Sequence, residues 1–180
     1  ALSYEDRKDT AKASELYREL IKENNKKPDV YIKIFAANQA EKQTDKAINV
    51  LKRGVKNLPE NAQLKALLGS TYLQAGQKEE AEKIVQSLLA LGEKKEVFNY
   101  VGDIYRDASD IAKAEEYYNK SLALDAAQTD AYFGLASTYF NKAVDVLKEA
   151  DKVPLDDMTG AYDKLKNESF DYFKKAIPNY

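Results

Sequence analysis

The segment LLGSTY (residues 67–72), followed by Ala81, is repeated along the chain as VGDIY (residues 101–105), followed by Ala114. The alanine recurs most regularly, at intervals of 34, 34 and 33 residues. Its four positions are Ala13, Ala47, Ala81 and Ala114. Self-similarity with a period of this length indicates a stack of supersecondary units, none of which can bury its apolar face alone.

Two further columns of residues keep the same spacing. One holds tyrosine with a single exception, at Tyr4, Asn38, Tyr72, Tyr105 and Tyr139. The other follows an aliphatic residue and holds Phe35, Gly69, Gly102 and Ala136. The small residues predict a close approach of two helices within each unit. The tyrosines predict large rings packed between successive units, each with its hydroxyl at a polar edge.

Apolar residues follow the helical i, i+3, i+4, i+7 pattern almost throughout, with Pro, Gly or Ser–Asp at the breaks. The expected helices are 1–7, 9–24, 28–41, 44–57, 61–75, 77–91, 95–107, 110–124, 128–151 and 155–180. They are expected to pair into five antiparallel hairpins. No segment alternates as a strand would, so the predicted fold class is all-α.

These columns resemble the tetratricopeptide repeat (TPR) family. The large aromatic that the family carries near the start of the first helix is matched by Tyr31, Phe98 and Tyr132, and its closing proline by Pro59. Lys65 departs from this aromatic column. The resemblance implies a right-handed superhelical solenoid of antiparallel helix pairs, whose concave face binds proteins or peptides. It covers regular repeats over residues 1–127, the first of them partial, and an elongated hairpin of the same solenoid over 128–180.

The elongated hairpin is predicted from a heptad rhythm on two facing helices, which is the pattern of an antiparallel coiled coil. The seam residues are Tyr132, Ala136, Tyr139, Ala143, Val146 and Ala150, then Met158, Tyr162, Leu165, Ser169, Tyr172 and Ala176. If Ala176 takes the column of Ala114, the unit is 28 residues longer than a repeat. That adds two heptads to each helix, about 21 Å at 1.5 Å per residue. If Ser169 takes the column instead, the insertion is 21 residues. The 28-residue alignment is preferred because equal additions keep the hairpin in register and Tyr180 then matches Tyr118, although Pro178 argues against it.

Composition argues against several kinds of chemistry. The chain has 28 basic and 30 acidic side chains, a formal net charge of −2, and neither cysteine nor histidine. A nucleic-acid surface needs clustered positive charge, and acid–base catalysis and zinc binding rely heavily on imidazole. We therefore expect no catalytic residue, no metal site, no cofactor and no nucleic-acid partner. No apolar run approaches the roughly 20 residues that span a bilayer.

The expected partner-binding groove consists of residues one or two places from the core columns of each first helix. These residues are Ile32, Ala36, Gln39, Ala66, Ser70, Leu73, Asn99, Asp103, Arg106, Phe133, Ser137 and Phe140. Family members that clamp a terminal carboxylate place Lys and Asn on successive turns of this face. The matching pairs here, Ile32/Ala36, Ala66/Ser70 and Asn99/Asp103, do not supply that set.

The sequence thus predicts a non-catalytic scaffold for a protein or peptide that it does not identify. One alternative is an architectural subunit of a larger assembly, such as one in the cell envelope, that docks or self-associates through the long hairpin and an uncapped C-terminal end. Another is glycan or small-ligand binding through surface aromatics. At that end Phe173, Ile177 and Tyr180 are expected to form an apolar face, as in a piece of a longer array. Cytoplasm, cell envelope and periplasm are all compatible with the composition.

Overall fold

The structure, a computed structural model, describes residue 19 and residues 26–154, 156 and 159–176. These residues form helices and no strand. The helices are α3 (Pro28–Ala40), α4 (Thr44–Asn57), α5 (Ala62–Gln74), α6 (Lys78–Leu89), α7 (Lys95–Asp107), α8 (Ile111–Leu124), α9 (Thr129–Ala150) and α10 (Ala161–Ala176). The all-α prediction is confirmed, and seven of these helices begin and end within two residues of the predicted limits.

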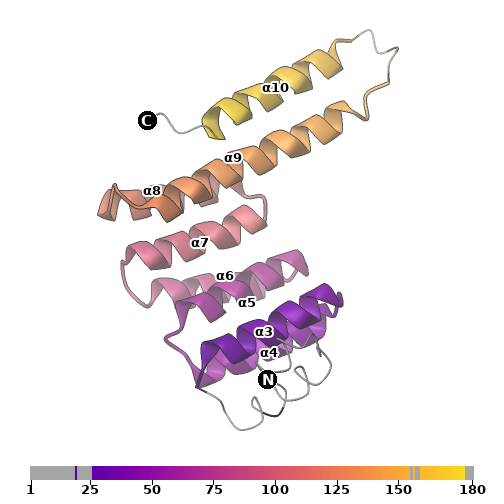
Figure 1. Ribbon diagram of the computed structural model, residues 1–180. Coiled ribbons are helices and arrows are strands. Elements are labelled where there is room, and N and C mark those ends of the chain that lie inside the picture. Colours follow the sequence, from indigo (N-terminus) through magenta and orange to yellow (C-terminus); the bar gives the residue numbers. More distant parts are fainter. Residues whose placement is uncertain (1–18, 20–25, 155, 157–158, 177–180) are drawn as a thin grey trace, which may run out of the picture. The chain divides into compact units, whose positions relative to one another are not determined.

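The chain divides into two compact units, Ala1–Gly92 and Glu93–Tyr180. In the first, α3 packs on α4 and α5 on α6, and α4 also packs on α5 (Figure 1). In the second, α7 packs on α8, α8 and α7 pack on α9, and α9 packs on α10 (Figure 1). Each unit is therefore a short stack of antiparallel helix hairpins.

The repeating columns form the cores of these stacks. Ala47, Ala81 and Ala114 are buried, as are Tyr72 and Tyr105. In the first unit the core cluster consists of Val30, Tyr31, Ile34, Ile48, Leu51, Leu64, Leu68, Tyr72 and Ala81. The predicted core positions Tyr4 and Ala13 lie outside the described residues.

The turn inside each regular hairpin has the same geometry in all three copies. The residue after the helix end adopts a left-handed conformation, with φ of 57° at Lys42, 74° at Gly76 and 58° at Ser109. The next N–H then donates to the carbonyl of the tyrosine column. These bonds are Gln43 to Asn38 (2.8 Å), Gln77 to Tyr72 (2.8 Å) and Asp110 to Tyr105 (2.9 Å). This is the Schellman arrangement, which satisfies helix-end carbonyls and sends the chain into the second helix.

Lys65 occupies an aromatic column without leaving its charge unpaired. Its ammonium donates to the carbonyl oxygen of Ser87, 2.9 Å away in the last turn of α6. The alkyl stem fills part of the ring's space, while the charge meets the negative end of a helix dipole. Burial lowers the pKa of Lys65, and the Glu60 carboxylate opposes that shift.

The last hairpin is elongated, as predicted. Helix α9 has 22 residues and the described part of α10 has 16, whereas the other helices have 12 to 14. The Ser169 hydroxyl donates to the carbonyl of Ala143 over 2.9 Å. In an antiparallel helix pair, a step of seven residues forward along one helix corresponds to a step of seven residues back along the other. The contact between Ser169 and Ala143 therefore places Ala176 opposite Ala136. That pairing supports the 28-residue alignment over the 21-residue one.

Three details of the hairpin differ from the prediction. Helix α10 begins at Ala161 and not at residue 155, and Gly160, with φ 75°, directly precedes it. Tyr162 and Tyr132 are exposed, although both were placed in the seam. Tyr132 lies beyond the part of α9 that the described α10 covers, and Tyr162 stands in the first turn of α10 at the hairpin's outer end. Met158, Ile177, Pro178 and Tyr180 fall outside the described residues.

Candidate functional site

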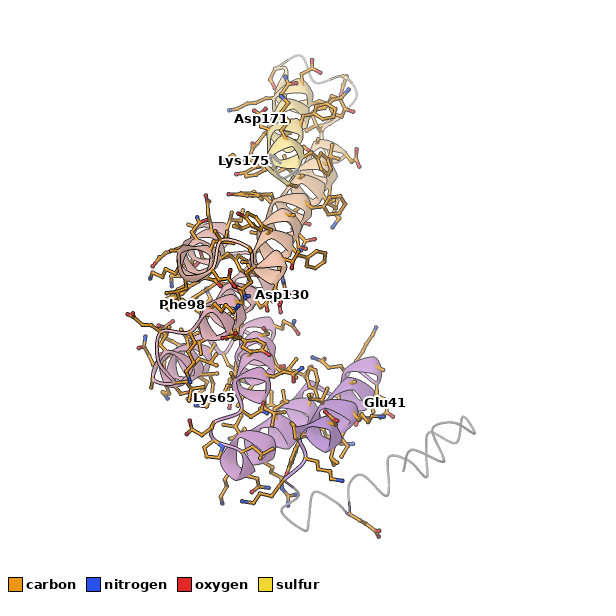
Figure 2. The ribbon with its side chains drawn as sticks, turned by 60° about the vertical axis from the view of Figure 1, so that its left-hand side comes forward. Glu41, Lys65, Phe98, Asp130, Asp171 and Lys175 are labelled. Carbon is orange, nitrogen blue, oxygen red and sulfur yellow. The ribbon has the colours of Figure 1, made fainter. Side chains whose placement is uncertain are left out.

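A groove of about 340 Å³ opens between α7 and the start of α9. Its lining residues are Glu96, Asn99, Tyr100, Asp103, Arg106, Gln128, Asp130 and Phe133. All of them belong to the second unit, and Asp130 lies in the first turn of α9 (Figure 2). Four of the twelve residues that the sequence assigned to a partner-binding face meet here: Asn99, Asp103, Arg106 and Phe133.

The Tyr118 ring from α8 supports this groove. It is fully buried against the backbones of α7 and α9, where two glycines leave room for it. A Cβ atom added at Gly102 would lie 2.7 Å from the ring, and one added at Gly134 would lie 2.3 Å from it. These distances are too short for any side chain, so both glycines are required by the position of the ring.

The Tyr118 hydroxyl enters a network of charged side chains. It donates to Asp103 Oδ1 over 2.7 Å, and Arg106 Nη1 donates to the same oxygen over 2.6 Å. Arg106 also reaches the Tyr118 hydroxyl oxygen at 3.2 Å and binds Asp107 Oδ1 through Nη2 at 3.0 Å. The arginine is thus fixed by two carboxylates and a phenol, and its geometry is set before any partner arrives.

The electrostatics of this network follow from its burial. Burial raises the pKa of Asp103, although the Arg106 guanidinium and the Tyr118 hydroxyl both pull it down. The pKa of Tyr118 is raised strongly, because its ring is buried and its hydroxyl faces Asp103. Burial and the Asp103 carboxylate also raise the pKa of Tyr100. Both phenols therefore stay protonated at neutral pH, and the Tyr118 hydroxyl donates its proton to Asp103 in a hydrogen bond.

Asn99 is an exception among the polar groups of the groove. Its side chain is buried, with 8% of the residue exposed, and its Oδ1 has no hydrogen-bond partner among the described residues. Gln128, the residue before α9, also lines the groove, and its side-chain oxygen accepts a bond from the Ser121 hydroxyl at 2.6 Å. A buried carbonyl without a donor is uncommon in folded proteins and costs about 1–3 kcal/mol. Asn99 Oδ1 is therefore an unsatisfied acceptor buried in the wall of the groove.

Comparison with known proteins agrees with this architecture. The tetratricopeptide repeat profile matches residues 5–68 and 38–99, and a second tetratricopeptide repeat profile matches 97–128. The chain belongs to the tetratricopeptide repeat family. No protein with a curated description matches the sequence.

Solved structures of other TPR proteins share the fold. The crystal structure of MamA is 21% identical, with a TM-score of 0.54, over 97% of this chain and 90% of MamA. The human IFIT1 dimer with m7Gppp-AAAA is 18% identical, with a TM-score of 0.54, over 92% of this chain. Only 38% of the IFIT1 chain is covered. At these identities the similarity concerns the fold alone, and TPR folds typically serve as non-enzymatic scaffolds for protein interactions.

The other residues of the predicted TPR groove lie outside this pocket. In the first unit Ile32 and Leu73 are half-buried against the core, Gln39 is half-buried, and Ala36 is exposed. Ala66 and Ser70 are buried and offer little surface. In the second unit Ser137 is half-buried, and Phe140 lies edge-on to the Phe173 ring, with centroids 5.5 Å apart.

Sequence reasoning missed half of the groove. Glu96, Tyr100, Gln128 and Asp130 line it but were not assigned to it. Glu96 lies three residues before the assigned Asn99, on the same side of the helix, so a wider predicted face would have included it. Tyr100 directly follows Asn99. Gln128 and Asp130 come from the loop and first turn before Phe133, where the repeat columns give no positions.

The described residues contain no group of three or more acidic side chains arranged to hold a metal ion. None of the described helices is both long and apolar enough to cross a membrane.

Proposed function

We propose that this TPR chain is a non-catalytic scaffold that holds a segment of a partner protein in the groove between α7 and α9. The observation that carries the proposal is the preorganised groove itself. Its floor is fixed by the Asp103–Arg106–Tyr118 network, and Phe133 stands at its edge with 72% of its surface exposed.

Phe133 supplies the apolar contact that such a site needs. Hot spots in interfaces are usually aromatic or arginine side chains surrounded by polar groups. Phe133 has polar and charged neighbours in the groove, including Asn99 and Asp130. Because the supporting side chains are already bonded to one another, little ordering cost remains for the partner to offset.

The charge of the groove favours protein over nucleic acid. The IFIT1 structure contains a capped RNA, whose phosphates require positive side chains. Here the lining has three carboxylates (Glu96, Asp103 and Asp130) and one cation, Arg106, which is held by Asp103 and Asp107. A phosphate chain would be repelled by this lining.

The test is capture from a native extract with matched variants. Phe133→Ala should reduce the recovery of bound protein, because truncating an interface hot spot costs about 2 kcal/mol or more. Phe170→Ala is the control: it removes another exposed phenylalanine, on α10, outside the groove. Both variants should melt close to the wild type. Equal capture by Phe133→Ala and wild type would exclude this groove as the main site.

A second candidate function is docking through the long hairpin. Phe140 and Phe170 are each about half exposed, at 52% and 49%, and Phe173 packs against Phe140. Exposed aromatic groups on neighbouring helices are typical of association surfaces. Light scattering after gel filtration tests this alternative: mass should rise with concentration in the wild type and fall back in Phe170→Ala. A mass that stays monomeric at all concentrations would argue against self-association.

A further inference from the structure

We propose that the groove between α7 and α9 recognises a basic side chain of the partner segment, and arginine in preference to lysine. This inference rests on the proposed function, because it specifies the chemistry of the same site. It does not depend on the name of the partner.

The first observation is the unpartnered acceptor. Asn99 lines the groove and is more than nine-tenths buried, yet its Oδ1 lacks a donor. Since Oδ1 can only accept, the missing group must carry an N–H or O–H. A ligand that brings a charged N–H donor would satisfy the atom with a bond stronger than a neutral one.

The second observation is the charge balance around that atom. Of the three lining carboxylates, only Asp103 is paired with a cation. Glu96 and Asp130 are exposed and have no cationic partner among the described residues. Lys95 lies near both, but its ammonium is held by Asp125 at 2.5 Å. The groove thus holds two carboxylates without a salt-bridge partner and, in its wall, one unsatisfied amide oxygen, and this combination is complementary to a single positive charge.

The third observation separates arginine from lysine. Tyr100 and Phe133 contribute aromatic rings to the same lining. A planar guanidinium can stack on a ring while it donates to several acceptors at fixed angles, whereas an ammonium is a compact point charge. Carboxylates and an amide oxygen that share one groove with aromatic rings match the guanidinium better.

The experiment titrates the full ¹⁵N-labelled chain with a short, capped peptide that carries one central arginine. The matched peptide replaces arginine by citrulline, which has nearly the same shape and no charge. We expect the arginine peptide to shift amide signals of residues 96–106 and 128–133 in a saturable way, the lysine peptide to bind more weakly, and the citrulline peptide to leave them unchanged. Citrulline binding equal to arginine, or shifts confined to other regions, would overturn the proposal.

Variants test the two kinds of acceptor. Asn99→Leu should weaken arginine-peptide binding about tenfold, the size of one charge-assisted hydrogen bond. The pair Glu96→Gln with Asp130→Asn should weaken it further and reduce its sensitivity to salt. The control pair, Asp145→Asn with Glu149→Gln, removes two exposed carboxylates of α9 and should change nothing. Unchanged binding in the groove pair refutes the inference, and this pair decides the question if Asn99→Leu unfolds.

The two proposals can fail separately. If Phe133→Ala loses the captured protein but the arginine peptide leaves the groove signals unshifted, the scaffold site stands and the arginine inference falls. If the arginine peptide binds in the groove but Phe133→Ala captures the partner normally, the proposed partner site is wrong, although the groove still takes a basic group.

Discussion

Tyr118 links the packing of the second unit to the chemistry of its groove. Its ring lies against the Gly102 and Gly134 backbones, and its hydroxyl fixes the carboxylate of Asp103. Asp103 in turn holds Arg106. A change that displaces the ring should therefore alter the groove as well as the core.

Gly134→Ala tests this link. Helix propensity alone favours alanine over glycine by about 1 kcal/mol. The added Cβ would lie only 2.3 Å from the Tyr118 ring, so we expect a net loss of about 1–3 kcal/mol from overpacking. Denaturant unfolding measures the loss. In a Tyr118→Leu background the same change should cost much less, and an equal cost in both backgrounds would show that the ring is not the obstacle.

Tyr105→Ala tests the tyrosine column. Tyr105 is 6% exposed, and its ring stacks on Tyr117 with centroids 5.8 Å apart. Deleting a buried aromatic side chain costs about 3–5 kcal/mol. Tyr162→Ala, at an exposed ring, should stay within about 0.5 kcal/mol of the wild type. Similar losses in the two variants, measured by the same unfolding curves, would contradict the assigned register.

Individual residues also show where sequence reasoning stops. The repeat spacing predicted that Ala136 is the small residue of α9 at the close helix contact. Ala136 is only half-buried, and the residue that lies against the Tyr118 ring is Gly134. The repeat predicts which helices touch. The exact contact residue depends on the size of Tyr118. Four residues after the repeat alanine, the chain carries the smaller Leu51 and Val85 in the two preceding units, and a second tyrosine, Tyr17, which lies outside the described residues.

At the scale of elements, the three Schellman turns explain why the helix limits could be predicted so closely. Each turn needs one left-handed residue, and the 34- and 33-residue spacing of Lys42, Gly76 and Ser109 follows the repeat. Only Gly76 adopts this conformation without steric cost. Lys42 and Ser109 have a Cβ atom, so the left-handed conformation that the turn requires costs some backbone strain at these two positions.

Opposite substitutions in these turns should have opposite effects. Gly76→Ala should destabilise by about 1 kcal/mol through backbone strain alone, because an added Cβ meets nothing within 4 Å. Ser109→Gly should be neutral or stabilising for the same reason. Thermal melting of the two variants checks the signs. A stabilised Gly76→Ala would mean that this turn does not require the left-handed conformation.

The long hairpin was predictable in length and not in its outer turn. Heptad spacing placed Ala143, Val146, Ala150 and Ser169 in the buried seam, and they are buried. The expected start of α10 at residue 155 rested on Pro154 as a break. Gly160, with φ 75°, is a second break directly before α10.

At the scale of the whole molecule, the resemblance of the residue columns predicted the family, and the helical periodicity predicted the absence of strands among the described residues. They predicted only four of the eight lining residues of the groove, because loop residues such as Gln128 and flanking acids such as Glu96 carry no periodic signal. Charge complementarity at a site depends on which side chains converge, and a repeat pattern alone does not give that.

The chain should lose stability at alkaline pH. Burial, with a bond to Glu115, raises the pKa of Tyr139 to about 12, and burial also raises the pKa of Tyr72 and Tyr100. A phenol with a raised folded-state pKa contributes stability that is complete below the unfolded value of about 10 and is lost as pH rises through the folded value. The lowered pKa of Lys65 makes the free energy of unfolding rise with pH, which opposes the effect of the tyrosines, but it is a single group.

Unfolding curves at a series of pH values, with phenolate absorbance recorded in parallel, measure this effect. We expect the free energy of unfolding to fall between about pH 10 and pH 12. Tyr139→Phe should flatten part of that fall. A pH-independent free energy over this range would contradict the burial of these phenols.

In the proposed function, a partner protein contacts the groove between α7 and α9. The most direct measurement is site-specific photocrosslinking in native extract, with a benzophenone amino acid at position 133 or, as the matched control, at position 170. We expect a discrete covalent adduct from position 133 and none of the same mass from position 170. An adduct formed at position 170 and absent at position 133 would contradict it and would place the contact on the long hairpin.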